Sequence, residues 1–176
     1  MNYSKLPFYL TLFTVAVLVF SCKDDDEPDP RRAFAGTYDV DELDATVRAG
    51  VEQVSDNFDV NTEIEFIINP DLDADEMEVE MDDFLEDMVR SLLAILDDDA
   101  IVQIDVDEMV VAEISGDEFE IDGAEVTLTV QTDDGPSVYQ MEVDIEGELK
   151  DGELEIEAET ALLYYILEVE TTAEKQ

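Results

Sequence analysis

The sequence predicts an α+β fold, in which an antiparallel β meander of about seven or eight strands carries one or two amphipathic helices. Apolar and polar residues alternate in many short runs of the second half, and Asp-Gly pairs separate several of these runs. An apolar stripe at helical spacing precedes them. Closure into a barrel, or at least strong curvature, is favoured because only closure removes unpaired edges. A two-layer sheet with helices on one face is the alternative.

The first elements are expected directly after a charged leader. Residues 34–40 have the composition of a short strand. Residues 41–58 place apolar side chains every three or four positions, which predicts a helix that Asp41 could cap. Residues 62–68 alternate in part and predict a second strand, which Asn69-Pro70 would end.

The clearest helix is expected from about Ala74 to Leu96. Acidic residues occupy most of its polar face, so few opposite charges are available for i,i+4 pairs and packing must hold the helix. We expect its methionine-rich stripe to be core, with an adaptable ligand-contacting surface as the alternative. The stripe consists of Met77, Met81, Phe84, Leu85, Met88, Leu92 and Leu96.

The rest of the chain predicts consecutive hairpins. Alternating or apolar runs indicate strands, and the turn residues between them indicate antiparallel pairing. Turns are expected at Asp122-Gly123, at Asp133-Asp134-Gly135-Pro136 and at Lys150-Asp151-Gly152-Glu153. The strand runs are residues 102–106, 110–114, 119–121, 126–130, 141–149 and a return strand from 154 that leads into 161–167.

The N-terminus has the layout of a secretory signal peptide over residues 1–21. Lys5 precedes an uncharged apolar stretch from Leu6 to Phe20, which is shorter than the roughly 20 residues that a permanent span needs. We expect Cys22 and an acidic tether over residues 22–33, a single globular domain over residues 34–172 and a C-terminal tail over residues 173–176.

The segment Val19-Phe20-Ser21-Cys22 resembles the lipobox of bacterial lipoproteins. That resemblance implies acylation of Cys22 and removal of the preceding peptide. The following residues Lys23, Asp24, Asp25 and Asp26 are similar to the export signal of Bacteroidota surface lipoproteins. Together these features predict a lipid anchor in the outer membrane, at the cell surface. A free or disulfide-forming thiol is the alternative role of Cys22, and acylation explains better why an exported chain has a single cysteine.

A second resemblance concerns the domain itself. The opening Gly36-Thr37-Tyr38 and the segment GELKDGELEIEAE at residues 147–159 are similar to lipocalin-like or calycin-like domains of Bacteroidota lipoproteins. A barrel of that kind could bind an apolar small-molecule ligand in its interior. The residues expected to line such a cavity are Val126, Leu128 and Val130, with Tyr139, Tyr164 or Tyr165 as polar tips.

The charge balance excludes several functions. The chain of 176 residues has 50 acidic and 8 basic residues, a formal net charge of −42. Such a body repels nucleic acid phosphates and anionic membrane surfaces, so nucleic acid is not an expected partner. The same composition is that of a protein in brine, and we expect a halophilic or marine host. The absence of histidine excludes Ser–His and Cys–His nucleophile pairs and every His-ligated metal.

A possible calcium site is the series of oxygen-bearing residues Asn69, Asp71, Asp73 and Asp75, with Glu80 eleven residues after the first. The spacing invites comparison with an EF-hand, whose ligands alternate in this way. Ala74 stands where the sharp turn of that loop needs glycine, so a solvated helix N-terminus is the preferred interpretation. No other cofactor is expected.

These observations predict a non-catalytic, lipid-anchored and highly acidic extracytoplasmic binding or accessory module, lipocalin-like in fold. Its partners would be the membrane through the anchor, and an apolar small molecule or an outer-membrane protein. One alternative is a structural or interaction subunit of an outer-membrane complex, without a ligand cavity. Another is a calcium-binding or carboxylate-dependent hydrolytic lipoprotein. The sequence contains no G-x-S-x-G or phosphate-binding glycine motif, so we do not expect an enzyme.

Overall fold

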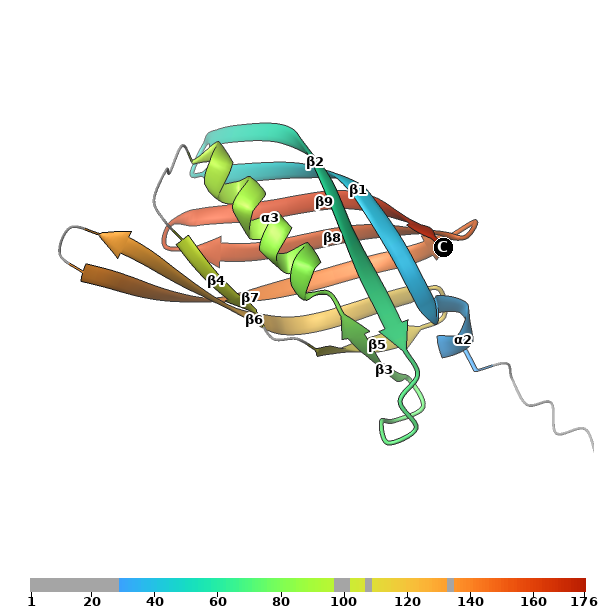
Figure 1. Cartoon of the computed structure of the whole chain (residues 1–176). Helices are drawn as coiled ribbons and strands as arrows, with labels where there is room; N and C mark the ends of the chain where they lie inside the picture. Colours follow the sequence, from blue (N-terminus) through green and yellow to red (C-terminus); the bar gives the residue numbers. More distant parts are fainter. Residues whose placement is uncertain (1–28, 97–101, 107–108, 133–134) are drawn as a thin grey trace, which may run out of the picture.

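The computed structural model describes residues 29–96, 102–106, 109–132 and 135–176 (Figure 1). This part of the chain forms two helices and nine strands, and neighbouring strands pair in antiparallel fashion. The predicted α+β fold with an antiparallel barrel is confirmed. The elements are α2 (Arg31–Phe34), β1 (Gly36–Ala49), β2 (Glu52–Ile67), β3 (Glu76–Glu80), α3 (Asp82–Ile95), β4 (Val102–Val106), β5 (Val110–Ser115), β6 (Glu118–Thr132), β7 (Gly135–Lys150), β8 (Glu153–Leu162) and β9 (Tyr165–Lys175).

Eight of the strands close into a barrel. Around the barrel the order is β6, β5, β3, β2, β1, β9, β8 and β7, and pairing between β7 and β6 completes the circle. The remaining strand, β4, lies on the same side of β6 as β5. β5 pairs with the start of β6 at Glu118–Glu120, and β4 pairs further along at Val126–Val130. The barrel is therefore extended at one end by β4 and by the projecting hairpin of β6 and β7 (Figure 1).

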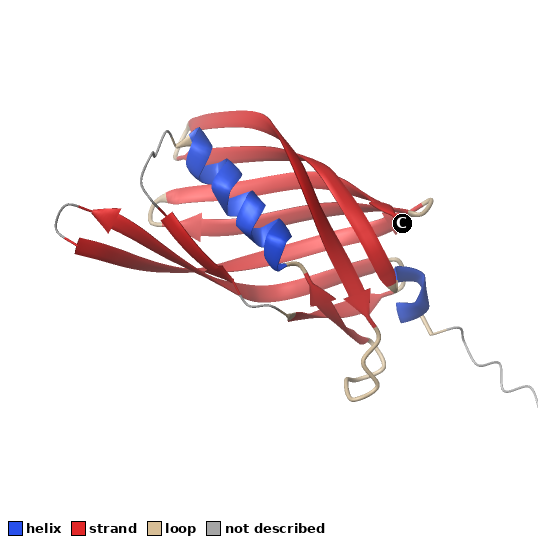
Figure 2. Ribbon diagram, in the orientation of Figure 1, coloured by secondary structure: helices blue, strands red, loops and turns tan. Residues whose placement is uncertain are grey.

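Helix α3 covers an opening in this wall. Strand β2 pairs with β3 only at residues 65–67, so its earlier part has β1 as its sole strand partner among the described residues. The helix packs against β2, β1 and β4 and crosses the space between β2 and β4 (Figure 2). The expected role of its apolar stripe as core is confirmed. Its buried apolar residues are Phe84, Leu85, Met88, Val89 and Leu92.

Two expected helical regions are partly or wholly strand. The helix expected from Ala74 begins at Asp82, because residues 76–80 alternate and form β3 between β2 and β5. The helix expected over residues 41–58 is wrong. That segment is the second half of β1 and the first half of β2, joined by a turn at Gly50-Val51.

The spacing of apolar residues predicts a helix at residues 41–58 because Leu43 and Val47 fit a helical stripe and a strand face equally well. Ala45 lies between them and is also buried, which completes a period of two. Gly50 has φ +64°, a conformation that suits the hairpin turn and is unfavourable inside a helix. A register shift between Val40 and Glu42 marks a bulge in β1.

The later turns agree with the sequence in part. The turn at Asp151-Gly152 is confirmed. Asp122-Gly123 is not a turn, because β6 runs through it with a bulge between Ile121 and Ala124. The expected return strand from residue 154 to 167 is two strands, since the chain reverses at Leu163-Tyr164.

The ends of the domain also extend beyond the expected strands. The strand expected at residues 34–40 begins at Gly36, and the last residues of the expected tether form α2. β9 continues to Lys175, into the expected tail, where Ala173 is buried.

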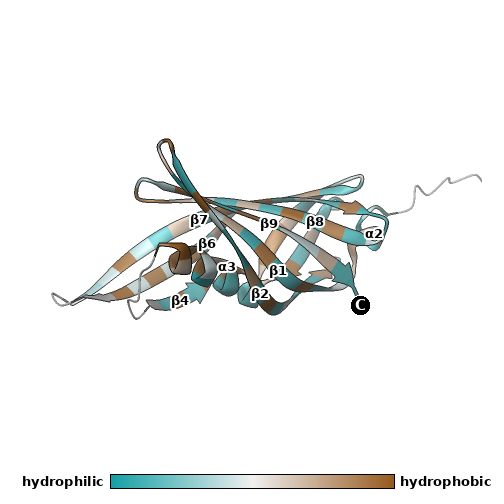
Figure 3. Cartoon of the chain, turned by 90° about the horizontal axis from the view of Figure 1, so that it is seen from above, coloured by the Kyte–Doolittle hydropathy of each residue, from teal (hydrophilic) through white to brown (hydrophobic). Residues whose placement is uncertain are grey.

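The core fills the barrel with inward-facing apolar side chains. In Figure 3 brown and teal alternate along the strands, as expected for a sheet with one buried face. Aromatic rings pack near α2, where the centroids of Phe66 and Phe119 are 5.1 Å apart and Phe34 lies 6.1 Å from Phe119. The Tyr38 hydroxyl donates a hydrogen bond of 2.9 Å to the Phe34 carbonyl. Gly147 is required here, because a Cβ at this position would lie 2.1 Å from Cε1 of Phe119.

Candidate functional site: an acidic outer wall

The outer wall of the barrel is covered with carboxylates. Strand β8 illustrates the cause, because its apolar residues alternate with glutamates and point to opposite faces. Leu154, Ile156 and Ala158 are buried, so the intervening residues must face outward. The outward glutamates of this strand are Glu153, Glu155, Glu157 and Glu159.

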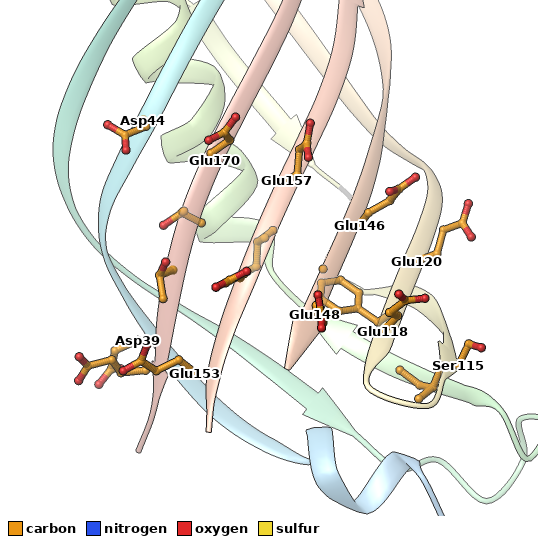
Figure 4. A pocket seen from close by; sticks show the side chains of 18 of the residues that line it. Asp39, Asp44, Ser115, Glu118, Glu120, Glu146, Glu148, Glu153, Glu157 and Glu170 are labelled. Carbon is orange, nitrogen blue, oxygen red and sulfur yellow. The ribbon is translucent and has the colours of Figure 1, made fainter. Parts of the chain in front are cut away.

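The strand register aligns these acids from strand to strand. Glu157 of β8 lies directly opposite Glu170 of β9 on one side and Glu146 of β7 on the other. Direct pairing continues in both directions around the barrel. Figure 4 shows how Asp44, Glu170, Glu157, Glu146 and Glu120 follow one another from strand to strand. Like charges placed opposite each other in a sheet are destabilising. The acidic row consists of Asp44, Glu170, Glu157, Glu146, Glu120, Glu113 and Glu76.

A broad hollow of about 1120 Å³ lies on this outer wall. All members of the acidic row except Glu76 line it, together with other outward acids such as Asp39, Glu148 and Glu174. Among the described residues, no lysine or arginine belongs to its lining. The hollow therefore has a strongly negative potential, which concentrates cations and repels anions.

The pKa of Glu120 is shifted by its position in the row. The neighbouring Asp122 carboxylate raises the pKa of Glu120 above its ordinary value of 4.5, and partial desolvation, Glu146 and Glu113 add to the rise. On α3, burial and the nearby Glu86 and Asp83 raise the pKa of Asp87, against the opposing effect of Arg90. Ionisation of both groups is therefore less favourable in the folded protein than in the unfolded chain.

Basic residues neutralise only the margins of the wall. Lys150 contacts Glu148 at 2.8 Å and Glu155 at 2.6 Å, and these two carboxylates raise the pKa of Lys150. Arg48 pairs with Glu168 near the opposite end of the barrel. Exposed pairs of this kind contribute little stability, so the row itself remains uncompensated.

The residues of the possible calcium site lie on the loop between β2 and β3 and on β3. The Asn69 side chain accepts a hydrogen bond of 2.9 Å from the Asp71 amide and donates one of 2.6 Å to Glu78. The Asp73 amide donates to the Glu76 carboxylate at 3.1 Å. Asp75 comes at the end of the loop, whereas Glu80 lies at the far end of β3.

These contacts are made within the loop and strand themselves. In the part of the chain that the structure describes, no group of three or more acidic or cysteine side chains is placed to hold a metal ion. Glu80 lies on β3 opposite Glu65 of β2 in the strand register, away from the loop. The structure thus does not assemble the five residues into a coordination shell.

Most of the residues expected around an interior ligand pack into the apolar core or against it. Val126 and Leu128 are buried in the core cluster, and Val130 is partly buried. Tyr139 packs against that cluster. Tyr164 is exposed at the turn between β8 and β9, where its hydroxyl accepts a hydrogen bond of 3.2 Å from the Tyr165 hydroxyl.

The expected anchor residues Cys22, Lys23, Asp24, Asp25 and Asp26 lie outside the described residues. Within the described ranges, no helix has the length and apolar character needed to cross a membrane. The acidic row was not identified from the sequence, although glutamate at every second position of residues 153–159 is a visible signal for it. Which acids lie opposite each other depends on the strand register, which the sequence does not give.

No protein-family model matches the chain, and no curated protein matches it. The class of the protein is therefore defined by its architecture. The residues that the structure describes form a closed eight-stranded antiparallel β-barrel with one extra strand and two helices. Its outer wall carries the acidic row and the hollow that most of this row lines.

Neutralising one member of the acidic row should stabilise the protein at low salt. Glu157→Gln relieves two like-charge pairs, with Glu146 and Glu170, and we expect a gain of up to about 1 kcal/mol in unfolding free energy. The control Gln140→Lys changes the net charge by the same amount as Glu157→Gln. It does so outside the acidic row, at an exposed site opposite Thr127. Urea unfolding at about 0.05 M and about 1 M NaCl measures both. Equal gains for the two variants would contradict a specific role for the row.

The raised pKa values predict a pH dependence of stability. A carboxyl with a raised folded pKa favours folding while it is protonated, and this contribution is lost as pH rises through the unfolded value toward the folded one. Glu120 and Asp87 therefore predict that the melting temperature rises as pH falls from about 7 toward their ordinary pKa values of 4.5 and 3.8 at low salt. Asp29 acts oppositely, because Arg31 lowers its pKa below the ordinary 3.8 and its contribution is lost in stronger acid. Calorimetric melts across this range measure the profile, and a melting temperature that falls steadily from pH 7 to 5 would contradict the prediction.

Proposed function

We propose that the chain is a lipid-anchored, non-catalytic accessory or interaction module of the outer-membrane surface that acts through the outside of its barrel. This proposal selects an interaction subunit over a carrier with an interior ligand. It assigns the barrel interior a structural role and leaves recognition to the acidic wall and to the strand turns.

The filled interior is the observation that carries the proposal. The inward side chains of the strands and the buried face of α3 form one apolar cluster, in which each buried member is 0–5% exposed. The buried polar side chains in the described ranges are Thr62, Ser91 and Thr160. Ligand sites combine open volume with a few polar groups that fix orientation. Here the hollow of about 1120 Å³ lies on the outer wall instead.

The lipobox-like segment and the following acidic residues support the anchor. Cys22 is the single cysteine of the chain, and two or more acyl chains give stable membrane attachment where one is marginal. The first described element, α2, lies at the end of the barrel where the C-terminus also lies (Figure 1). A tether that starts at Cys22 would therefore reach the barrel at this end.

The net charge of −42 limits what the module can bind. Nucleic acid and anionic membrane surfaces are repelled, so a protein partner should present neutral or basic side chains. The same charge supports a saline environment, because screening at high ionic strength weakens the repulsion within the acidic row.

Metabolic labelling in the native host with an alkyne analogue of palmitate tests the anchor. We expect the wild-type chain to be labelled and recovered with the outer membrane, and Cys22→Ser to lose the label and leave that fraction. The control Ser21→Ala keeps a small residue before the cysteine and should be labelled like the wild type. An unlabelled wild-type chain, or equal labelling of Cys22→Ser, would contradict the proposal.

A further inference from the structure

The turn between β1 and β2 and the turn between β8 and β9 lie at the end of the barrel opposite α2 (Figure 1). Exposed apolar side chains gather on both turns. Val51 is fully exposed at the turn between β1 and β2. Leu163 and Tyr164 are 73% and 71% exposed at the turn between β8 and β9. Val54 and Ile166 flank these turns and are also exposed. We call these five residues the apolar tip.

The strand register places the two turns side by side. β1 pairs with β9, and Arg48 lies opposite Ile166. Each turn begins within three residues of that pair, so both project from the same end of adjacent hairpins. At the usual spacing between strands, the centres of the two hairpins are about 10 Å apart. One partner surface can therefore cover both turns.

Backbone strain at Leu163 points to a role for this turn. Leu163 has φ +58°, a left-handed conformation that is costly for a residue with a branched side chain. The other two-residue turns of the described barrel use glycine here, at Gly50, Gly116 and Gly152, and the one further residue with a positive φ in these turns is Asp151, at φ +54°. Aspartate visits this region more readily than leucine does. Burial does not explain the leucine, because its side chain is exposed. Strained residues of this kind cluster at binding sites and active sites.

The side chains suit a protein interface better than a second copy of the chain. The ring centroids of Tyr164 and Tyr165 lie 4.4 Å apart with the ring planes tilted by 39°, and this packed pair forms an aromatic anchor of the type that dominates binding energy. Carboxylates such as Glu52 and Glu168 stand beside the tip, the latter paired with Arg48. Two copies with a net charge of −42 each would repel, whereas a basic rim on a partner would be attracted.

We propose that the apolar tip docks a protein partner whose surface has an apolar recess bordered by lysine or arginine side chains. This inference rests on the proposed function as an interaction module and names the surface that it uses. The tip projects from the end of the barrel away from the expected tether. β1 alone spans about 40 Å between the two ends, at the usual rise per residue of a strand. An anchored module would thus present the tip away from the membrane.

A synthetic amphipathic peptide of leucine and lysine, LKKLLKLLKKLLKL, serves as the probe, because it presents an apolar face bordered by lysine side chains. Fluorescence anisotropy at about 0.1 M NaCl compares the wild type with Leu163→Gly/Tyr164→Ser, which removes apolar area at constant charge. We expect this variant to bind the peptide about tenfold more weakly or worse. The control Val111→Ser/Val138→Ser removes exposed apolar side chains elsewhere and should change the affinity by less than about twofold. An all-lysine peptide should bind all three proteins equally.

Glycine relieves the strain at residue 163, so the tip variant should melt at or above the wild-type temperature. Weakened binding then cannot be assigned to unfolding. Equal binding of the leucine–lysine peptide by wild type and tip variant would overturn the inference and leave the acidic wall as the binding surface. Tip-dependent dimerisation in sedimentation equilibrium, or tip-dependent binding to phosphatidylcholine vesicles, would also overturn it. Failure of the proposed anchor appears separately, as loss of palmitate labelling.

Discussion

The structure depends on the alternation of side chains in a sheet that closes on itself. Closure gives every strand one buried face, so each apolar residue at every second position enters the core and each intervening residue must face solvent. In β8 this rule places Leu154 and Ile156 inside and Glu155 and Glu157 outside. The packed core must therefore offset the repulsion between the carboxylates of the acidic row.

Because the closed barrel is filled with side chains, the surfaces available for binding lie on its outside. Helix α3 covers the opening between β2 and β4, and the rings near α2 fill the other end of the barrel. The interior has few polar groups and a continuous apolar cluster, whereas the outer wall has the hollow and the turns carry exposed apolar side chains. Charge would select the partners, and the apolar tip would supply the contact area.

Much of the fold could be predicted from the sequence, because period-two alternation and an amphipathic helix are local signals. The prediction of a helix at residues 41–58 is wrong because Leu43 and Val47 fit both a helical period and a strand period of two. Pairing with β9 stabilises the strand. The turn predicted at Asp122-Gly123 is a bulge in the structure, because β6 and β7 remain paired on both sides of it. The acidic wall follows from alternation, but the row requires the register. The strain at Leu163 arises only from the backbone path of the turn.

The central claim is that the barrel interior is packed rather than hollow, and methyl NMR under xenon pressure tests it most directly. Xenon occupies apolar cavities, and the methyl groups of Val126, Leu128, Ile121 and Ile145 report from the interior, the last two near Phe119. Phe119→Ala should serve as the positive control, because it leaves a void beside Phe34 and Phe66. The account predicts saturable methyl shifts in that variant and none in the wild type. Saturable shifts of the same methyl groups in the wild-type protein would contradict it and would restore an interior ligand as the function of the barrel.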